Sequence, residues 1–187
     1  MPSTPSESIR YSQFFYEEEE VSVVFTKAFP SVMIGGVPVG PFEEGRDARV
    51  PFWVARILEA EGFVKIVDGD AQPLKPSDLY KLCWKEERNE GLSKLPKHFY
   101  PRLRLLLASL NEAIKDNPTH TVLSEHQQSN MKAKDLVTCR LQKILQLAME
   151  RNPSKTSIDL LEPEELALYN TIRTGIEEWR KRITSPE

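Results

Sequence analysis

The uneven distribution of glycine and proline is the feature that most constrains the fold of this chain. Both residues are dense up to Pro76 and sparser afterwards. Because both residues favour turns and interrupt regular elements, the first part should hold short elements joined by turns. The sequence therefore predicts an α+β protein, in which a small N-terminal β-rich domain precedes an all-α helical bundle domain of about four helices.

The β-rich domain is predicted at residues 20–70. Runs of β-branched and aromatic residues favour strands there, and Pro51 and Gly62 bracket a short amphipathic helix. We expect strands in "VSVVFTKAF", "SVMIGG", "FVKIV" and, as a third possibility, "RDARVP". Residues 1–19 begin Ser/Pro-rich and are expected to be disordered or extended. The boundary between the β-rich domain and the helical domain is expected within the segment "DGDAQPLKP", with a linker at residues 71–76.

The helical domain is predicted at residues 77–187. Ser77 should cap the first helix, and an apolar stripe from Phe99 to Ile114 predicts a second helix. The polar segment Asn117–Asn130 is interpreted as a loop or frayed helix start. A third helix is predicted from Met131 onward. Its main apolar stripe comprises Val137, Leu141, Ile144, Leu145 and Ala148. Pro163 should begin the fourth helix.

Three glycines near the start, Gly35, Gly36 and Gly40, raise the question of a phosphate-binding loop. A dinucleotide fingerprint requires G-x-G-x-x-G opening a helix, and the spacing here does not fit. A P-loop requires Gly-Lys-Ser/Thr before a helix, and that sequence is missing here. We therefore interpret Gly35-Gly36 as a turn between strands and Gly40-Pro41 as a second turn.

The sequence contains no recognisable catalytic or metal-binding motif. The acidic run Glu17–Glu20 is interpreted as solvated or as protection of a sheet edge. His120 and His126 match no common zinc spacing, and no nucleophile elbow is present. Cys83 and Cys139 are expected to be reduced, buried side chains. We predict a protein that is not an enzyme and uses no metal or cofactor.

Charge and hydropathy exclude further classes of protein. The chain carries a net charge of −3, and neither half is strongly basic, which disfavours an autonomous nucleic-acid binder. Weak contact with a phosphate backbone stays open at the segment "KLPKHFYPRLR", which contains Lys94, Lys97, Arg102 and Arg104. No segment reaches the roughly 20 apolar residues of a membrane helix. No signal peptide is evident, so we expect a cytoplasmic protein.

Apolar residues occupy more than one face of the later helices. Leu168 lies off the main stripe of its helix, and Leu136, Cys139 and Leu147 lie off theirs. Such residues are buried against a second neighbour, either in a larger internal core or at a subunit interface. We favour the interface, partly because of the family resemblance described below. The candidate partner-interface residues are Phe99, Tyr100, Leu136, Leu147, Leu166, Leu168 and Tyr169.

Four motifs follow one another along the chain. The first comprises "IGG", "GPF" and "VPFWVA", and the helical part adds "LPKHFYPRL", "RLQKILQLA" and "LEPEELALYNTI". In this order they resemble the small domain and three helices of the GINS family of DNA replication factors. With the β-rich domain first, the order resembles the archaeal subunit related to the second and third eukaryotic GINS subunits.

The resemblance implies a scaffold without catalytic activity. It implies a heterotetramer with a sister GINS subunit of opposite domain order, although a single subunit type stays possible. It also implies partners at the replication fork, namely the MCM helicase and a RecJ-like replication protein, with nucleoid association and weak or indirect DNA contact. The alternative function is a stand-alone nucleic-acid-binding protein.

Overall fold

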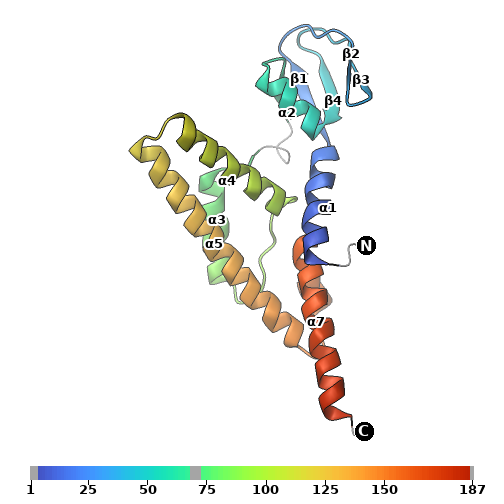
Figure 1. The fold of residues 1–187 in the computed structure, drawn as a ribbon, viewed down its shortest axis with the longest axis vertical. Coiled ribbons are helices and arrows are strands. Elements are labelled where there is room, and N and C mark those ends of the chain that lie inside the picture. Colours follow the sequence, from blue (N-terminus) through green and yellow to red (C-terminus); the bar gives the residue numbers. More distant parts are fainter. Residues whose placement is uncertain (1–3, 68–72, 186–187) are drawn as a thin grey trace. The chain divides into compact units, whose positions relative to one another are not determined.

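The chain forms two compact units in a computed structural model that describes residues 4–67 and 73–185. One unit combines residues 1–12 with 73–187 and is helical, and the other comprises residues 13–72 and contains the strands. The predicted α+β class, with a small β-rich part before a helical bundle, is confirmed (Figure 1). The division at residues 20–70 and 77–187 into independent domains stays a prediction, and part of the predicted linker, residues 71–72, lies outside the described residues.

The N-terminal segment corrects one expectation, because α1 is a helix at Pro5–Glu18 rather than extended chain. Thr4 and Glu7 form a reciprocal capping box: the Thr4 Oγ1 accepts from the Glu7 backbone at 3.2 Å, and Glu7 Oε2 accepts from the Thr4 backbone at 3.1 Å. This Thr-x-x-Glu pattern starts helices, and the Ser/Pro composition concealed it. Residues 1–3 of the predicted disordered segment lie outside the described residues.

The small unit is built on a three-stranded antiparallel sheet with the order β4-β1-β5. Its elements are β1 (Glu20–Phe25), β4 (Asp47–Pro51), α2 (Phe52–Ala60) and β5 (Val64–Ile66). Alternate residues of the central strand β1, Val21, Val23 and Phe25, are buried. Because β1 lies in the middle, the acidic run before it does not protect a sheet edge. Instead Glu20 pairs with Arg49 at 3.8 Å on the surface.

A separate hairpin joins β2 (Val32–Ile34) to β3 (Val37–Val39), and its turn is Gly35-Gly36 as predicted. The strand β3 was not anticipated. Gly35 has φ +59°, and a Cβ atom there would lie 2.7 Å from the Trp53 ring. Both the backbone conformation and the close approach of the ring therefore require glycine, which answers the question of the phosphate loop in favour of a structural turn.

The helical unit contains four long helices, and α3 and α4 pack against α5 as α7 does (Figure 1). The helices are α3 (Pro76–Arg88), α4 (Phe99–Asp116), α5 (His120–Met149), the short α6 (Lys155–Ile158) and α7 (Pro163–Thr184). The predicted start of α7 at Pro163 is confirmed. Lys75 rather than Ser77 occupies the N-cap position of α3, without a side-chain capping hydrogen bond, and Pro76 stands in the first turn.

The long helix α5 corrects the loop predicted at Asn117–Asn130. Its cap is Thr119, whose side chain accepts a hydrogen bond from the Val122 backbone at 3.4 Å. The segment is polar because most of its side chains face solvent, and a solvated helix of this kind lacks an apolar stripe. Only Ser129 of the segment is fully buried.

Candidate protein-interaction surface

A buried cluster around Arg140 fixes how the helices of the helical unit meet. Arg140 lies on α5 and is fully buried. Its Nη1 donates to Glu86 Oε2 of α3 at 3.0 Å and to the Ser93 carbonyl at 2.9 Å. Its Nε and Nη2 form a two-point contact with Glu165 of α7, and Nη2 also donates to the Leu160 carbonyl at 3.3 Å. An arginine has five N–H donors, so every donor of Arg140 has an acceptor.

Two further side chains complete this cluster, and one of them, Lys143, adds a second positive charge. Lys143 Nζ lies 2.8 Å from Glu86 Oε1, and the Tyr100 hydroxyl donates to Glu165 Oε1 at 2.5 Å. Burial alone would raise the pKa of Glu86, but hydrogen bonds from Lys143 and Ser93 and the Arg140 charge outweigh it and hold that pKa below its ordinary value. Glu86 is therefore ionised and paired with cations rather than poised for proton transfer.

The Arg140 cluster also determines which face of α5 points inward. On the Arg140 side, Leu136, Ile144 and Leu147 are buried. The main stripe expected from the sequence included Val137, Leu141 and Leu145, and these three are partly exposed. The correction has a physical cause: both faces of α5 are apolar, but only the face with Arg140 can neutralise the two buried glutamates.

Four of the seven candidate interface residues lie inside the chain's own core. Phe99 and Leu136 belong to the cluster between α3, α4 and α5, and Leu147 and Tyr169 belong to the cluster between α5 and α7. They are buried, so a partner cannot reach them in this structure. Tyr100 and Leu168 are half-buried, and Leu166 is exposed. The interface prediction therefore stays open only for these three.

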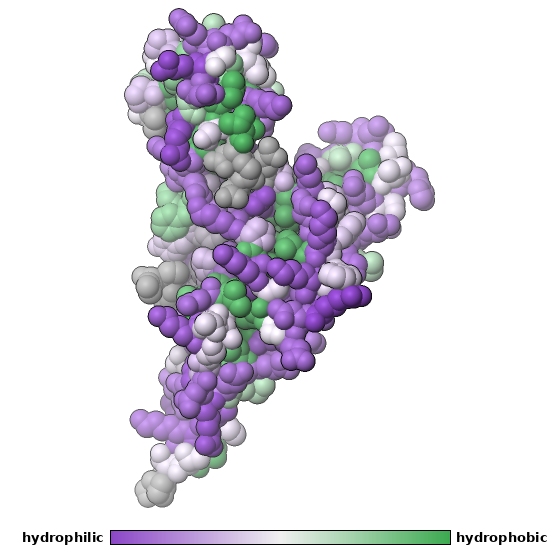
Figure 2. Space-filling view, turned by 180° about the vertical axis from the view of Figure 1, so that it is seen from behind, coloured by the Kyte–Doolittle hydropathy of each residue, from purple (hydrophilic) through white to green (hydrophobic). Residues whose placement is uncertain are grey.

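An exposed apolar ridge on α5 is the surface that sequence reasoning did not select. We define the α5 ridge as Val137, Leu141, Leu145 and Met149, which follow one another at intervals of four residues and are all exposed. Residues at this spacing lie on one face of a helix. On the face of the molecule seen in Figure 2, hydrophobic side chains form small patches within a largely hydrophilic surface.

The α5 ridge borders an open pocket of about 270 Å³ in the helical unit. The pocket is lined mainly by apolar side chains, and its polar lining residues are Tyr100, Arg104, Glu164 and Glu165. The apolar lining residues are Pro5, Ile9, Val137, Leu141, Ile144 and Leu168. An exposed pocket of this character suits an apolar side chain of a partner, because its lining is mainly apolar.

The basic segment that sequence analysis considered for DNA contact is largely occupied within the chain. Arg102 is buried, and Arg104 Nη2 lies 4.0 Å from Glu164. Phe99, the aromatic residue between the basic ones, is in the core. These side chains therefore do not form one exposed basic surface.

One possible metal-binding group occurs within the described residues: Cys83, Glu87 and Asp135. Cys83 is buried, and burial together with a hydrogen bond to Glu87 raises its pKa to about 11. The Lys132 ammonium lies 3.9 Å from Glu87 and 3.4 Å from Asp135. A lysine that already pairs with both carboxylates accounts for the group, and a protonated thiol is a poor ligand.

The remaining sequence candidates have ordinary structural surroundings. His126 Nε2 lies 2.7 Å from Asn111 Oδ1, and Cys139 is a free, half-buried thiol. Within residues 4–67 and 73–185, every helix falls short of the length or apolar character that crossing a membrane requires.

Two family models match the chain, one for each part of it. The model described as the GINS complex protein helical bundle domain matches residues 73–184, and the model described as the PSF2 N-terminal domain matches residues 8–67. These matches agree with the position of the helical unit and with that of the β-rich part.

Two curated relatives are similar to the chain over part of its length. A "Probable DNA replication complex GINS protein PSF2" of Caenorhabditis elegans is 33% identical over 85 residues, covering 46% of this chain and 46% of that protein. A "DNA replication complex GINS protein PSF2" of Xenopus laevis is 28% identical over 106 residues, covering 57% and 55%. The chain thus spans about half the length of the curated relatives it matches.

Proposed function

The chain belongs to the GINS family of DNA replication proteins, and from this membership we propose that it is a non-enzymatic scaffold subunit of a GINS complex. Its sister subunits would bind through the helical unit in a heterotetramer. The assembly would support the MCM helicase, together with a RecJ-like protein, at the replication fork. The archaeal origin and the number of subunit types stay predictions.

The observation that carries this proposal is the α5 ridge beside its apolar pocket. Four exposed apolar side chains in a row are unfavourable on a free surface, and contiguous patches of this kind mark protein interaction sites. The apolar stripe of α7 also continues past its buried part, because Trp179 and Ile183 are exposed near the end of that helix. A partner that covers these residues gains free energy from their burial.

The alternative function, a stand-alone nucleic-acid-binding protein, has less support. The net charge is −3, and the basic segment from Lys94 to Arg104 contains a buried arginine and an arginine near Glu164. A scaffold needs neither a basic field nor a catalytic group, and its recognition surface is apolar.

Light scattering after size-exclusion chromatography tests the scaffold proposal. The chain is measured alone and with the opposite-order subunit from the same source, first unchanged and then as Leu141→Asp. The matched control is Leu123→Asp, because Leu123 lies on the same helix with the same exposed fraction of 39%. It is about 27 Å from Leu141 along the helix axis.

We expect the unchanged chain and Leu123→Asp to form a complex near four chains in mass, and Leu141→Asp to stay unassembled. A charge buried without a partner at an interface costs several kcal/mol, on the order of a thousandfold in affinity. Assembly of Leu141→Asp as complete as that of the control would contradict the placement of the interface. A monomeric unchanged chain in both runs would contradict the scaffold function itself.

A further inference from the structure

The outward face of α3 carries aromatic and basic side chains that the assembly surface does not use. Leu79, Cys83 and Glu86 of this helix point into the core. The opposite face combines two rings with three cations at spacings of one, three and four residues. Its members, which we call the α3 face, are Tyr80, Lys81, Trp84, Lys85 and Arg88.

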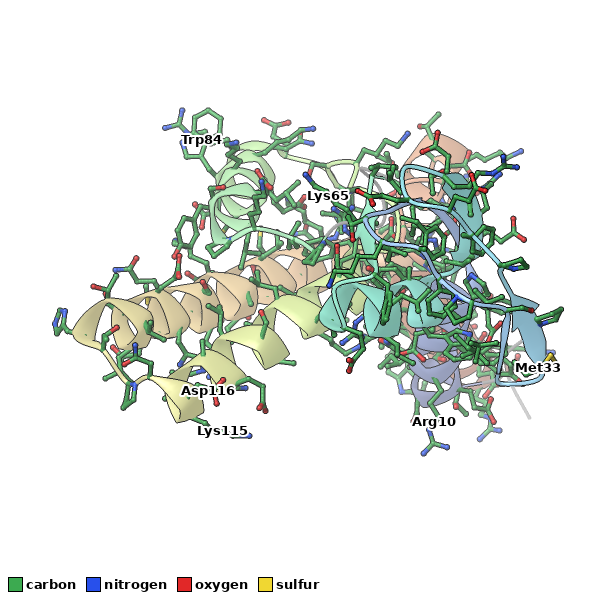
Figure 3. All side chains as sticks on the ribbon, turned by 90° about the horizontal axis from the view of Figure 1, so that it is seen from above. Arg10, Met33, Lys65, Trp84, Lys115 and Asp116 are labelled. Carbon is green, nitrogen blue, oxygen red and sulfur yellow. The ribbon has the colours of Figure 1, made fainter. Side chains whose placement is uncertain are left out.

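Trp84 is the centre of the α3 face. Its side chain is 56% exposed, which is unusual for so large an apolar group, and it projects outward from the helix in Figure 3. The Arg88 guanidinium lies over one side of the ring, 4.2 Å from its centroid. A cation on one side holds the ring in place and leaves its other side for a second planar partner.

The charges of the α3 face favour an anionic partner. Lys81 pairs with Asp78 at 3.3 Å, but both side chains are largely exposed, so this pair is easily exchanged. Among the described residues, no carboxylate lies within 4.0 Å of the Lys85 or Arg88 cation. The face thus presents unneutralised positive charge on a chain whose net charge is negative.

We propose that the α3 face binds single-stranded nucleic acid. A base stacks on the open side of the Trp84 ring, and Lys85 and Arg88 contact the neighbouring phosphates, with Tyr80 as a second ring one helical turn away. Charge alone would also attract an acidic peptide, but such a peptide has no planar group for the exposed ring. The net charge of −3 on the chain opposes binding to a polyanion, so the contact is weak.

This proposal is independent of the scaffold function, because the α3 face shares no residue with the α5 ridge or its pocket. The test uses the full chain with a fluorescein-labelled oligothymidylate, and anisotropy gives the dissociation constant over a series of salt concentrations. Three variants are compared: Trp84→Ala, Lys85→Gln and the control Trp179→Ala. Trp179 is also exposed, at 64%, and it too is followed by basic residues, on α7.

Each variant has a distinct expected result. Trp84→Ala should weaken binding by about 5- to 100-fold at every salt concentration, because one stacked base is worth about 1–3 kcal/mol. Lys85→Gln should reduce the slope of log K against log salt by about 0.7, the value for one phosphate contact on a single strand. Trp179→Ala should bind like the unchanged chain.

Three results would overturn the proposal. The first is no binding by the unchanged chain at low salt. The second is an equal affinity of Trp84→Ala and Trp179→Ala for the oligothymidylate. The third is displacement of the oligonucleotide by polyglutamate with a matching loss of polyglutamate binding in Trp84→Ala, which would assign the face to acidic peptides instead.

Discussion

Replacement of Arg140 by methionine is the perturbation whose effect the structure determines most closely. Methionine supplies an unbranched, apolar side chain and removes the charge and all five donors. Glu86 and Glu165, which are buried, would then lose their shared cation. Removing one partner of a buried pair costs about 3–5 kcal/mol, because the carboxylate left behind is neither solvated nor neutralised. We expect a loss of this size, which falls mainly on Glu165, because Glu86 keeps the Lys143 ammonium at 2.8 Å.

Thermal and urea denaturation followed by far-UV circular dichroism measure this loss. A loss of about 3 kcal/mol corresponds to a fall of roughly 10 °C in the melting temperature for a chain of this size. The control is Lys115→Met, because Lys115 forms an exposed ion pair with Glu112 at 2.8 Å. It projects into solvent in Figure 3, and its replacement should leave the melting temperature unchanged.

The pH dependence of the difference in unfolding free energy between the unchanged protein and Arg140→Met provides a second readout. In the unchanged protein, the lowered pKa of Glu86 contributes stability above the pKa of the unfolded chain, and this contribution is lost as the pH falls. In Arg140→Met, protonation of a carboxylate that has lost its cation relieves the cost of its burial. The gap between the two proteins should therefore narrow on acidification. A gap that is constant with pH, or a loss no larger than that of the control, would refute the reasoning.

Three further changes have defined outcomes. Burial, together with the neighbouring acids Glu165 and Glu164, raises the pKa of Glu162 to about 7. The free energy of unfolding should therefore fall by about 1 kcal/mol, after allowance for solvent screening, as the pH rises from 5 to 8. Glu162→Gln should flatten this pH dependence when it is measured by urea denaturation. Gly35→Ala should cost about 2–4 kcal/mol, seen in a near-UV melt that reports on Trp53, because φ is positive and the ring is in the way. Tyr100→Phe should cost about 1.5–3 kcal/mol in urea denaturation, because it removes a part-buried hydrogen bond to the Glu165 carboxylate; a change within the error of that measurement would contradict it.

The fold followed from the sequence where local patterns and tertiary packing agree. The β-branched run of β1, the Gly35-Gly36 turn and Pro163 at the start of α7 are each determined by a few adjacent residues. The helix α1 was not predicted, because its Thr4–Glu7 capping box is a short signal within a Ser/Pro-rich segment. The first turns of α5 were predicted as a loop or frayed helix start, because a solvated helix has no apolar stripe in its sequence.

The candidate surface could be predicted only in part, for a different reason. Periodicity correctly indicated that α5 is apolar on more than one face, but it cannot decide which face is internal. That decision depends on Glu86 and Glu165, which are 54 and 25 residues away from Arg140 in the sequence. A long-range ion pair leaves no local pattern in the sequence. The sequence therefore predicted Val137 and Leu141 on the main stripe of α5 and Leu136 and Leu147 off it, whereas in the structure Leu136 and Leu147 are the buried residues.

The Arg140 cluster also has a consequence for how α5 finds its place along its neighbours. Leu136 and Ile144 lie one turn before and one turn after Arg140, on the same buried face. Apolar packing alone would accept α5 shifted by a full turn, because one branched aliphatic side chain would replace another. Such a shift would set a leucine or isoleucine against two buried carboxylates. The cluster thus selects one alignment of α5 along its neighbours. A structure with α5 shifted by one turn would be less stable by several kcal/mol rather than by a fraction of one.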